Sequence, residues 1–316
     1  MWWIPGALAF FIVFAFFIEW VDRRFVARLQ DRYGPIYTGT GGVLQPWADF
    51  IKLLSKEDIT PAASDKVLFR LAPLVLPIFP IVGLCLTPIL GKPIIGFDGD
   101  LIVAFFLMSV YTIMIFIAGY GSGNSFGIVG GTRAALQMLG YEVPFALAMI
   151  GPAILAGTLS ISEIAYSQSN IWYAIPLALG FAVFMVCSLA EVDVVPFDIP
   201  HAKQEIVAGW ETEYSGRKLA LIHLAENLEM VFISALATAL FLGGGYGPFS
   251  PPIPPAVWFI IKTLIVAIVI SNLRAIFARF KIITLVEWSW KYLLPLAIVQ
   301  LLVLELFFEL GVIPWP

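Results

Sequence analysis

The chain has 316 residues, of which 60% are hydrophobic and only 13% are charged, with a net charge of −4 at pH 7. Its repeated apolar runs of about 20 residues match what a ~30 Å hydrocarbon core requires, which indicates a polytopic membrane protein. The composition excludes a separate soluble domain and a basic, aromatic surface for nucleic acid. Cys85 and Cys187 lie far apart in apolar runs, so no disulfide framework or cysteine-held cluster is expected.

The first predicted span runs from Trp3 to Trp20, and it is too long for a cleavable signal. The basic segment DRRFVARLQDRYGP follows it. Positive charge is retained on the cytoplasmic side of membranes, so four arginines should hold this end inside: Arg23, Arg24, Arg28 and Arg32. Residues 44–59 (LQPWADFIKLLSKEDI) place apolar side chains at helical spacing opposite charged ones, which predicts an amphipathic helix along the membrane surface.

The remaining apolar runs complete a set of eight predicted transmembrane helices, at roughly 67–90, 100–120, 141–160, 171–190, 219–243, 256–274 and 293–312. Both termini would then lie outside, with cytoplasmic loops at 21–66, 119–141, 191–218 and 275–292. In this orientation every Lys and Arg lies on the inner side except Lys92 and Lys262. The predicted fold class is therefore an all-α membrane protein, a single polytopic domain over 1–316, in the plasma membrane and in contact with lipid.

Two segments are expected to depart from regular helix. Residues 119–139 (GYGSGNSFGIVGGTRAALQML) are too rich in glycine for a continuous helix and too apolar for a solvated loop. This pattern predicts broken or re-entrant backbone covered by protein. Prolines at 73, 77, 80 and 88 predict a kinked second span.

The most unusual stretch is 189–230, a polar loop that leads into an apolar helix and gathers carboxylates. Burying an unpaired carboxylate costs several kcal/mol or forces it to bind a proton, so acids in such a place favour a function. An alternative is that each acid only pairs with Arg or Lys near the cytoplasmic edge. The acids are Glu191, Asp193, Asp198, Glu205, Glu211, Glu213, Glu226 and Glu229.

These acids and their polar neighbours form a candidate relay. His223 precedes Glu226 by three residues, so the two can share a helix face and exchange a proton. Glu142 begins another span, and Tyr141 or Tyr214 can link carboxylates into a path that carries protons or responds to a nearby redox centre. Glu305 and Glu309, near the outer end of the last helix, are interpreted as interfacial acids.

A metal site is not predicted, although His223-x-x-Glu226 has the spacing of a di-iron ligand pair. Such sites need a second pair from another helix, and His201, in a loop, is the only other histidine. The glycine-rich segment matches no phosphate-binding pattern, and there is no nucleophile triad.

Long motifs along nearly the whole chain resemble the respiratory complex I subunit 1 family, the eight-helix membrane subunit shared by NADH:quinone oxidoreductases and energy-converting membrane-bound hydrogenases. They occupy residues 22–53, 130–144, 190–216, 224–230 and 277–297. The resemblance implies that the cytoplasmic loops dock onto a hydrogenase-like large subunit and an iron-sulfur small subunit. It also implies antiporter-like membrane partners, with no cofactor in this chain and with iron-sulfur clusters and a nickel-iron site in partner subunits.

The same resemblance assigns roles to individual residues. It implies ion-coupling roles for Glu142, Glu191, Glu205, Glu213 and Glu226, and a docking or cavity role for the arginines Arg23, Arg24, Arg28 and Arg32. The argument from the acid cluster adds Asp193 and Glu229 to the ion-coupling carboxylates and makes His223, Tyr141 and Tyr214 the relay groups. Asp198 and Arg133 are added as docking or cavity candidates.

Two departures bear on the branch of the family. The chain has Asp22-Arg23 where quinone-using members have Glu-Arg, and Pro200-His201-Ala202-Lys203 where they have Pro-Glu-Ala-Glu. This difference favours the archaeal membrane-bound hydrogenase branch. The function predicted is a redox-inactive anchor and coupling subunit of a ferredoxin-linked complex that moves protons or sodium ions. The alternatives are the quinone-site subunit of an NADH- or reduced-deazaflavin-dependent quinone oxidoreductase, a stand-alone ion transporter, and a structural anchor.

Overall fold

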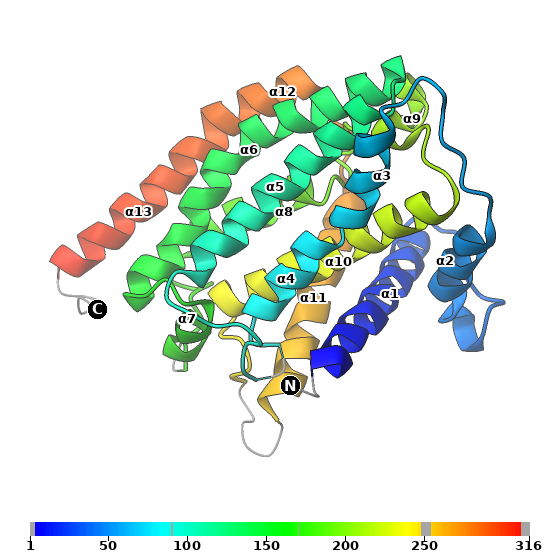
Figure 1. The fold of residues 1–316 in the computed structure, drawn as a ribbon. Helices are drawn as coiled ribbons and strands as arrows, with labels where there is room; N and C mark the ends of the chain where they lie inside the picture. Colours follow the sequence, from blue (N-terminus) through cyan, green and yellow to red (C-terminus); the bar gives the residue numbers. More distant parts are fainter. Residues whose placement is uncertain (1–3, 90, 170, 248–253, 311–316) are drawn as a thin grey trace.

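The computed structural model describes residues 4–89, 91–169, 171–247 and 254–310, and these residues form a helical bundle without strands (Figure 1). The prediction of an all-α membrane protein is confirmed. The helices are α1 Ile4–Leu29, α2 Gln45–Ser55, α3 Lys66–Val75, α4 Ile78–Leu86, α5 Asp100–Gly121, α6 Ser125–Ala156, α7 Ile161–Ser167, α8 Ala178–Glu191, α9 Lys203–Ile206, α10 Gly216–Phe241, α11 Pro255–Ile276, α12 Ile282–Trp288 and α13 Leu294–Glu309.

Seven helical segments of the described chain are long and apolar enough to cross a membrane: α1, α3 with α4, α5, α6, α10, α11 and α12 with α13. The remaining predicted span, 171–190, is a helix only as α8, whose 14 residues extend about 21 Å, less than a ~30 Å core. Pro176 explains the late start, because proline disfavours helical backbone in the residue before it. The segment 244–255, between the predicted spans 219–243 and 256–274, lies partly outside the described residues, as do parts of the predicted spans near residues 3, 90 and 311.

Helix α10 is the central helix, and α1, α2, α3, α4, α7 and α11 pack around it. Its residues from Leu228 to Phe241 are all buried, which fits a helix that is apolar on every side. In Figure 1 it passes through the middle of the bundle. A carboxylate carried by this helix is therefore held inside the protein.

The predicted kink in the second span is confirmed, and the first span is longer than predicted. The second span is broken between α3 and α4 at Leu76 and Pro77, as its prolines predict. Helix α1 continues to Leu29, well beyond Trp20, because arginine is a good helix former. The basic segment therefore begins on the helix and not in a loop.

The predicted backbone breaks across residues 119–139 are wrong for most of that range. Helix α6 is continuous from Ser125, and the interruption is confined to residues 122–124, where the Asn124 side chain caps α6 by accepting a hydrogen bond from the Phe126 amide at 3.0 Å. The glycines serve close packing instead. A Cβ on Gly131 would lie 3.0 Å from the Phe116 carbonyl oxygen of α5, so glycine allows the two helices to approach.

Helix α1 begins and α13 ends on the same side of the bundle, whereas α9 and the start of α12 lie at the opposite end (Figure 1). Helix ends on one side require an even number of passages through the bundle, so the short α8 adds one passage to the seven longer segments. Which of these sides faces the cytoplasm stays an expectation.

Candidate functional site

A polar cavity of about 280 Å³ opens where α1, α10 and α11 meet the loop after α8. We call it the acid cavity, since carboxylates from four segments line it. Its charged and polar lining comprises Glu19, Asp22, Asp193, Asp198, His201, Lys203, Glu211, His223, Glu226, Asn227 and Arg274.

Helix α10 brings two predicted carboxylates to the inner end of this cavity. Glu226 lines the cavity itself, and Glu229, one turn further along the helix, is only 3% exposed. The hydroxyl of Tyr111, on α5, donates a hydrogen bond to Glu229. The three-residue spacing places the two acids on neighbouring faces, so one meets the cavity and the other meets the helix bundle.

The end of α8 supplies two more predicted acids. Glu191 is 4% exposed, and its carboxylate accepts a hydrogen bond from the buried phenol of Tyr141 on α6. Asp193 follows in a left-handed backbone conformation (φ 52°), and its Oδ1 accepts a hydrogen bond from Gln137 Nε2 at 2.7 Å. The same Gln137 amide donates to the Ala190 carbonyl at 2.7 Å, so α6 holds this turn in place.

Burial raises the pKa of Asp193 well above its usual value, and the negative charges of Glu191, Asp198 and Glu211 raise it further. Asp198 also has a raised pKa because of burial, which His201, Arg279 and Arg274 oppose only in part. Asp193 and Asp198 are therefore protonated more readily than ordinary aspartates.

The carboxylates form a connected series that we call the acid row: Glu211, Glu226, Glu229, Glu191 and Glu142. Each member lies within electrostatic range of the next, Glu211 of Glu226, Glu226 of Glu229, Glu229 of Glu191 and Glu191 of Glu142. Asp193 lies beside the middle of the row, within range of Glu226 and Glu229. At the far end Glu142, on α6, accepts a hydrogen bond of 2.5 Å from the Ser109 hydroxyl of α5. The row thus leads from the cavity into the α5–α6 interface.

The imidazole beside Glu226 belongs to His201 and not to His223. His201 Nε2 lies 3.8 Å from a Glu226 oxygen, and His201 Nδ1 lies 3.8 Å from a Glu211 oxygen. His223 lines the cavity without a direct bond to Glu226 among the described contacts. The predicted His223–Glu226 pair is therefore replaced by a contact across 25 residues of sequence, which helix periodicity alone does not reveal.

Three of the predicted ion-coupling and relay residues lie away from both the acid row and the acid cavity. Glu205 is exposed and forms an ion pair of 2.5 Å with Arg133, whose hydrogen bond and charge lower the pKa of Glu205. Glu213 accepts a 2.5 Å hydrogen bond from the Asn124 amide, at the start of α6. Tyr214 donates to the Ala118 carbonyl at 3.1 Å and stacks on Phe69, which makes it a packing residue of a separate apolar cluster.

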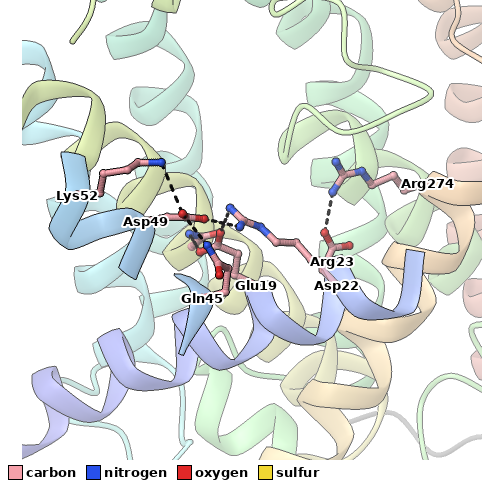
Figure 2. A network of polar contacts seen from close by, with 8 residues as sticks. Glu19, Asp22, Arg23, Gln45, Asp49, Lys52 and Arg274 are labelled. Atoms are coloured by element: carbon pink, nitrogen blue, oxygen red, sulfur yellow. Dashed lines mark hydrogen bonds and ion pairs between the residues drawn. The ribbon is translucent and has the colours of Figure 1, made fainter. Parts of the chain in front are cut away.

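The predicted arginines of the first loop connect helices. Arg23, on α1, forms ion pairs with Glu19 and with Asp49 of α2, the latter at 2.7 Å (Figure 2). Burial alone would raise the pKa of Asp49, but hydrogen bonds from Arg23 and Gln45 outweigh it and lower the pKa. On the other side of α1, Asp22 accepts a 2.8 Å hydrogen bond from Arg274 of α11 (Figure 2). These ion pairs hold α2, the predicted amphipathic helix, and α11 against α1.

The other arginines lie towards the surface. Arg24 donates to the Gly41 carbonyl at 3.2 Å and lies over the Trp20 ring, and Arg28 is exposed. Arg32 donates to Gln30 at 2.9 Å and lines a second cavity of about 180 Å³.

Sequence reasoning missed four residues of this site. Glu19 lies within the first predicted span and was not predicted as a site residue, although an acid inside a predicted span itself indicates a functional site. Glu211 was counted among the acids of the 189–230 stretch but was not predicted as a site residue. Gln137 and Tyr111 carry no signal in the sequence, because only the packing of α5 and α6 brings them to the acids.

The arrangement defines a class, a multi-pass α-helical membrane protein with a polar cavity and buried carboxylates. Comparison with known proteins gives the family. The NADH dehydrogenase family matches residues 3–305. The H-type subunit of NADH-quinone oxidoreductase from Dehalococcoides mccartyi (strain ATCC BAA-2266 / KCTC 15142 / 195) is 40% identical over 93% of this chain and 82% of the relative. Its counterparts from Methylococcus capsulatus (38%; 95% of each chain) and Geobacter metallireducens (38%; 94% and 93%) are similarly close. The chain therefore belongs to the NADH dehydrogenase family, among the homologues of this NADH-quinone oxidoreductase subunit, which confirms the predicted complex I subunit 1 family.

Proposed function

We propose that this chain is the membrane coupling subunit of a quinone-reducing oxidoreductase complex, and that it links electron transfer in docked partner subunits to ion movement through the acid row. One observation carries the proposal: a continuous series of carboxylates runs from an open polar cavity into the helix bundle of a member of this family. Carboxylates at such depth in a membrane protein are costly, and they commonly mark ion pathways.

The relatives support the quinone alternative over the hydrogenase interpretation favoured by the sequence alone. The relatives named above are all called NADH-quinone oxidoreductase subunits, and none carries a hydrogenase name. The acid cavity lies beside the basic end of α1, where a quinone head group would meet polar side chains. In this proposal the redox cofactors belong to partner subunits that dock on the cytoplasmic side. Antiporter-like membrane subunits complete the proposed complex, which lies in the plasma membrane with both termini outside.

The decisive experiment is the substitution Glu226→Gln in the assembled complex, which removes the charge at the cavity end of the acid row and keeps the side chain's size. Electron transfer from NADH to quinone and proton uptake by proteoliposomes are measured together. Assembly is expected to survive while ion translocation is lost, and Glu229→Gln is expected to act in the same way. Glu163→Gln is the matched control, because Glu163 lies outside the row on α7 and bonds to Thr158. Undiminished translocation in both row variants would contradict the proposal.

A second candidate function, the ferredoxin-linked hydrogenase type, retains one observation in its favour, since His201 and Lys203 stand where quinone-using members carry acids. The purified complex separates the two. Quinone reduction without nickel supports the quinone proposal, whereas nickel together with hydrogen evolution from reduced ferredoxin would replace it.

A further inference from the structure

Three separate segments bring metal-binding side chains together at the mouth of the acid row. His201 comes from the loop after α8, Glu211 from the short 3₁₀ helix Gly209–Glu211, and Glu226 from α10. One imidazole nitrogen and one oxygen from each carboxylate all lie within 4.8 Å of one another. Neither Glu211 nor Glu226 forms an ion pair with lysine or arginine among the described residues, where His201 is their only recorded ion-pair partner.

A second observation points to a missing cation. Glu211 Oε1 is buried and has no hydrogen-bond partner in the described part of the chain. A buried oxygen without a donor costs free energy, and a carboxylate oxygen costs more than a neutral one. On the opposite wall of the cavity the acids are matched by bases, since Arg23 pairs with Glu19 and Arg274 with Asp22. On the His201 side, Glu211 and Glu226 have no such ion pair with lysine or arginine among the described residues.

We propose that His201, Glu211 and Glu226 form a binding site for a divalent transition metal of the Zn²⁺ class. An imidazole with two carboxylates is a typical three-ligand set for zinc, which leaves a fourth position for water. The neighbouring cavity of about 280 Å³ has room for that water. Metal–ligand bonds of about 2.0–2.2 Å bring tetrahedral ligand atoms to roughly 3.4 Å apart. The ligand atoms, which now lie within 4.8 Å of one another, would therefore approach by up to about 1.4 Å, a shift within the reach of side-chain rotation.

The hard cations Mg²⁺ and Ca²⁺ do not fit this ligand set. They prefer six or more oxygen ligands, and magnesium keeps most of its waters, whereas this site offers two carboxylates and a nitrogen. Imidazole in the set therefore selects for zinc over the more abundant magnesium.

Occupancy would fix the first acids of the row. A bound Zn²⁺ occupies the imidazole nitrogen and holds Glu211 and Glu226 in one arrangement, so it would act as an inhibitor of the coupling path. This consequence rests on the proposed function, whereas binding of the metal does not.

The test uses the purified complex after removal of metals with a chelator. Zinc binding is titrated calorimetrically with wild type, His201→Gln, Glu211→Gln and the matched control His223→Gln, which removes the other cavity imidazole outside the ligand set. We expect one site that both ligand variants lose or weaken by at least ~10-fold, and that His223→Gln retains. The zinc X-ray absorption spectrum of wild type, minus that of His201→Gln, should show nitrogen and oxygen neighbours near 2.0–2.1 Å.

Equal zinc affinity in wild type and both ligand variants would overturn the site, as would the absence of any binding by wild type. The two ligand variants come from different loop segments, so a folding defect in one does not remove the test. Translocation is then measured with and without zinc. Binding that disappears with His201 but leaves translocation unaffected would establish the site and contradict the role given to the acid row.

Discussion

Replacing Gly130 by alanine is expected to displace the loop that carries Glu211 and His201. A Cβ at this position of α6 would lie 2.4 Å from the Trp210 amide nitrogen and 2.8 Å from the Gly209 carbonyl carbon, whereas ordinary contacts begin at 3.4 Å. The shortfall is about 1 Å against backbone atoms, which cannot rotate away as a side chain would. Gly209 is itself tightly packed, since it has φ 59° and a Cβ there would lie 1.8 Å from the Pro200 carbonyl oxygen, so the loop has little room to move away.

Overpacking of this kind costs about 1–3 kcal/mol. We therefore expect Gly130→Ala to lower the thermal midpoint of the purified complex and to reduce coupled translocation more than it reduces assembly. Gly6→Ala is the control, because nothing lies within 4 Å of a Cβ there and alanine favours helix by up to about 1 kcal/mol. A Gly130→Ala complex with the wild-type midpoint and full coupling would refute the argument that α6 positions the loop.

Two further predictions concern ionisation and helix ends. Burial raises the pKa of Asp193, so its contribution to stability is full below its unfolded pKa of about 3.9 and is lost as pH rises through the higher folded pKa. The thermal midpoint of Asp193→Asn, measured from pH 4 to 8, should therefore rise relative to wild type as pH increases, and a falling difference would contradict this. Lys262→Met removes the ammonium that donates to the carbonyls of Leu242 at 2.5 Å, Gly244 at 3.1 Å and Tyr246, and it should cost at least about 1.5 kcal/mol. The substitution Lys92→Met, at an exposed lysine, should leave the thermal midpoint unchanged. Equal effects of the two substitutions would contradict the role of Lys262 in binding the carbonyls at the end of α10.

The spans and the acids of α10 could be predicted because each rests on local information. Apolar length fixes a membrane helix, and a carboxylate inside one stands out against its neighbours. The prolines at the α3–α4 break act on their own backbone, so the kink could also be predicted from the sequence. The short length of α8 could not be predicted, because the run 171–190 is apolar throughout while Pro176 delays the start of the helix.

The composition of the acid cavity could not be predicted, because it depends on contacts between distant segments. His201 reaches Glu226 through the fold of a loop whose turns use positive φ at Asp193, Val207 and Gly209. The prediction of broken backbone from the glycines of residues 119–139 was wrong for a related reason. Glycine weakens an isolated helix, but its lack of a side chain is what permits α6 to pack closely on α5 and on the loop.

The charges around the acid cavity give its two walls different properties. On the α1 and α11 wall, Arg23 pairs with Glu19 and Arg274 with Asp22, so these ion pairs hold the helices together. On the α10 and loop wall, His201 is the only recorded ion-pair partner of Glu211 and Glu226 in the described part of the chain, although Lys203 lines the same cavity. Asp193 lies within electrostatic range of both acids. Unit charges about 4 Å apart interact by ~4 kcal/mol at an effective dielectric constant near 20, and His201 lies 3.8 Å from both Glu211 and Glu226, so a charge arriving there acts directly on these two acids. Beyond Glu226, each carboxylate of the acid row lies within electrostatic range of the next as far as Glu142. The proposed coupling function therefore requires the effect to pass from one carboxylate to the next along this row.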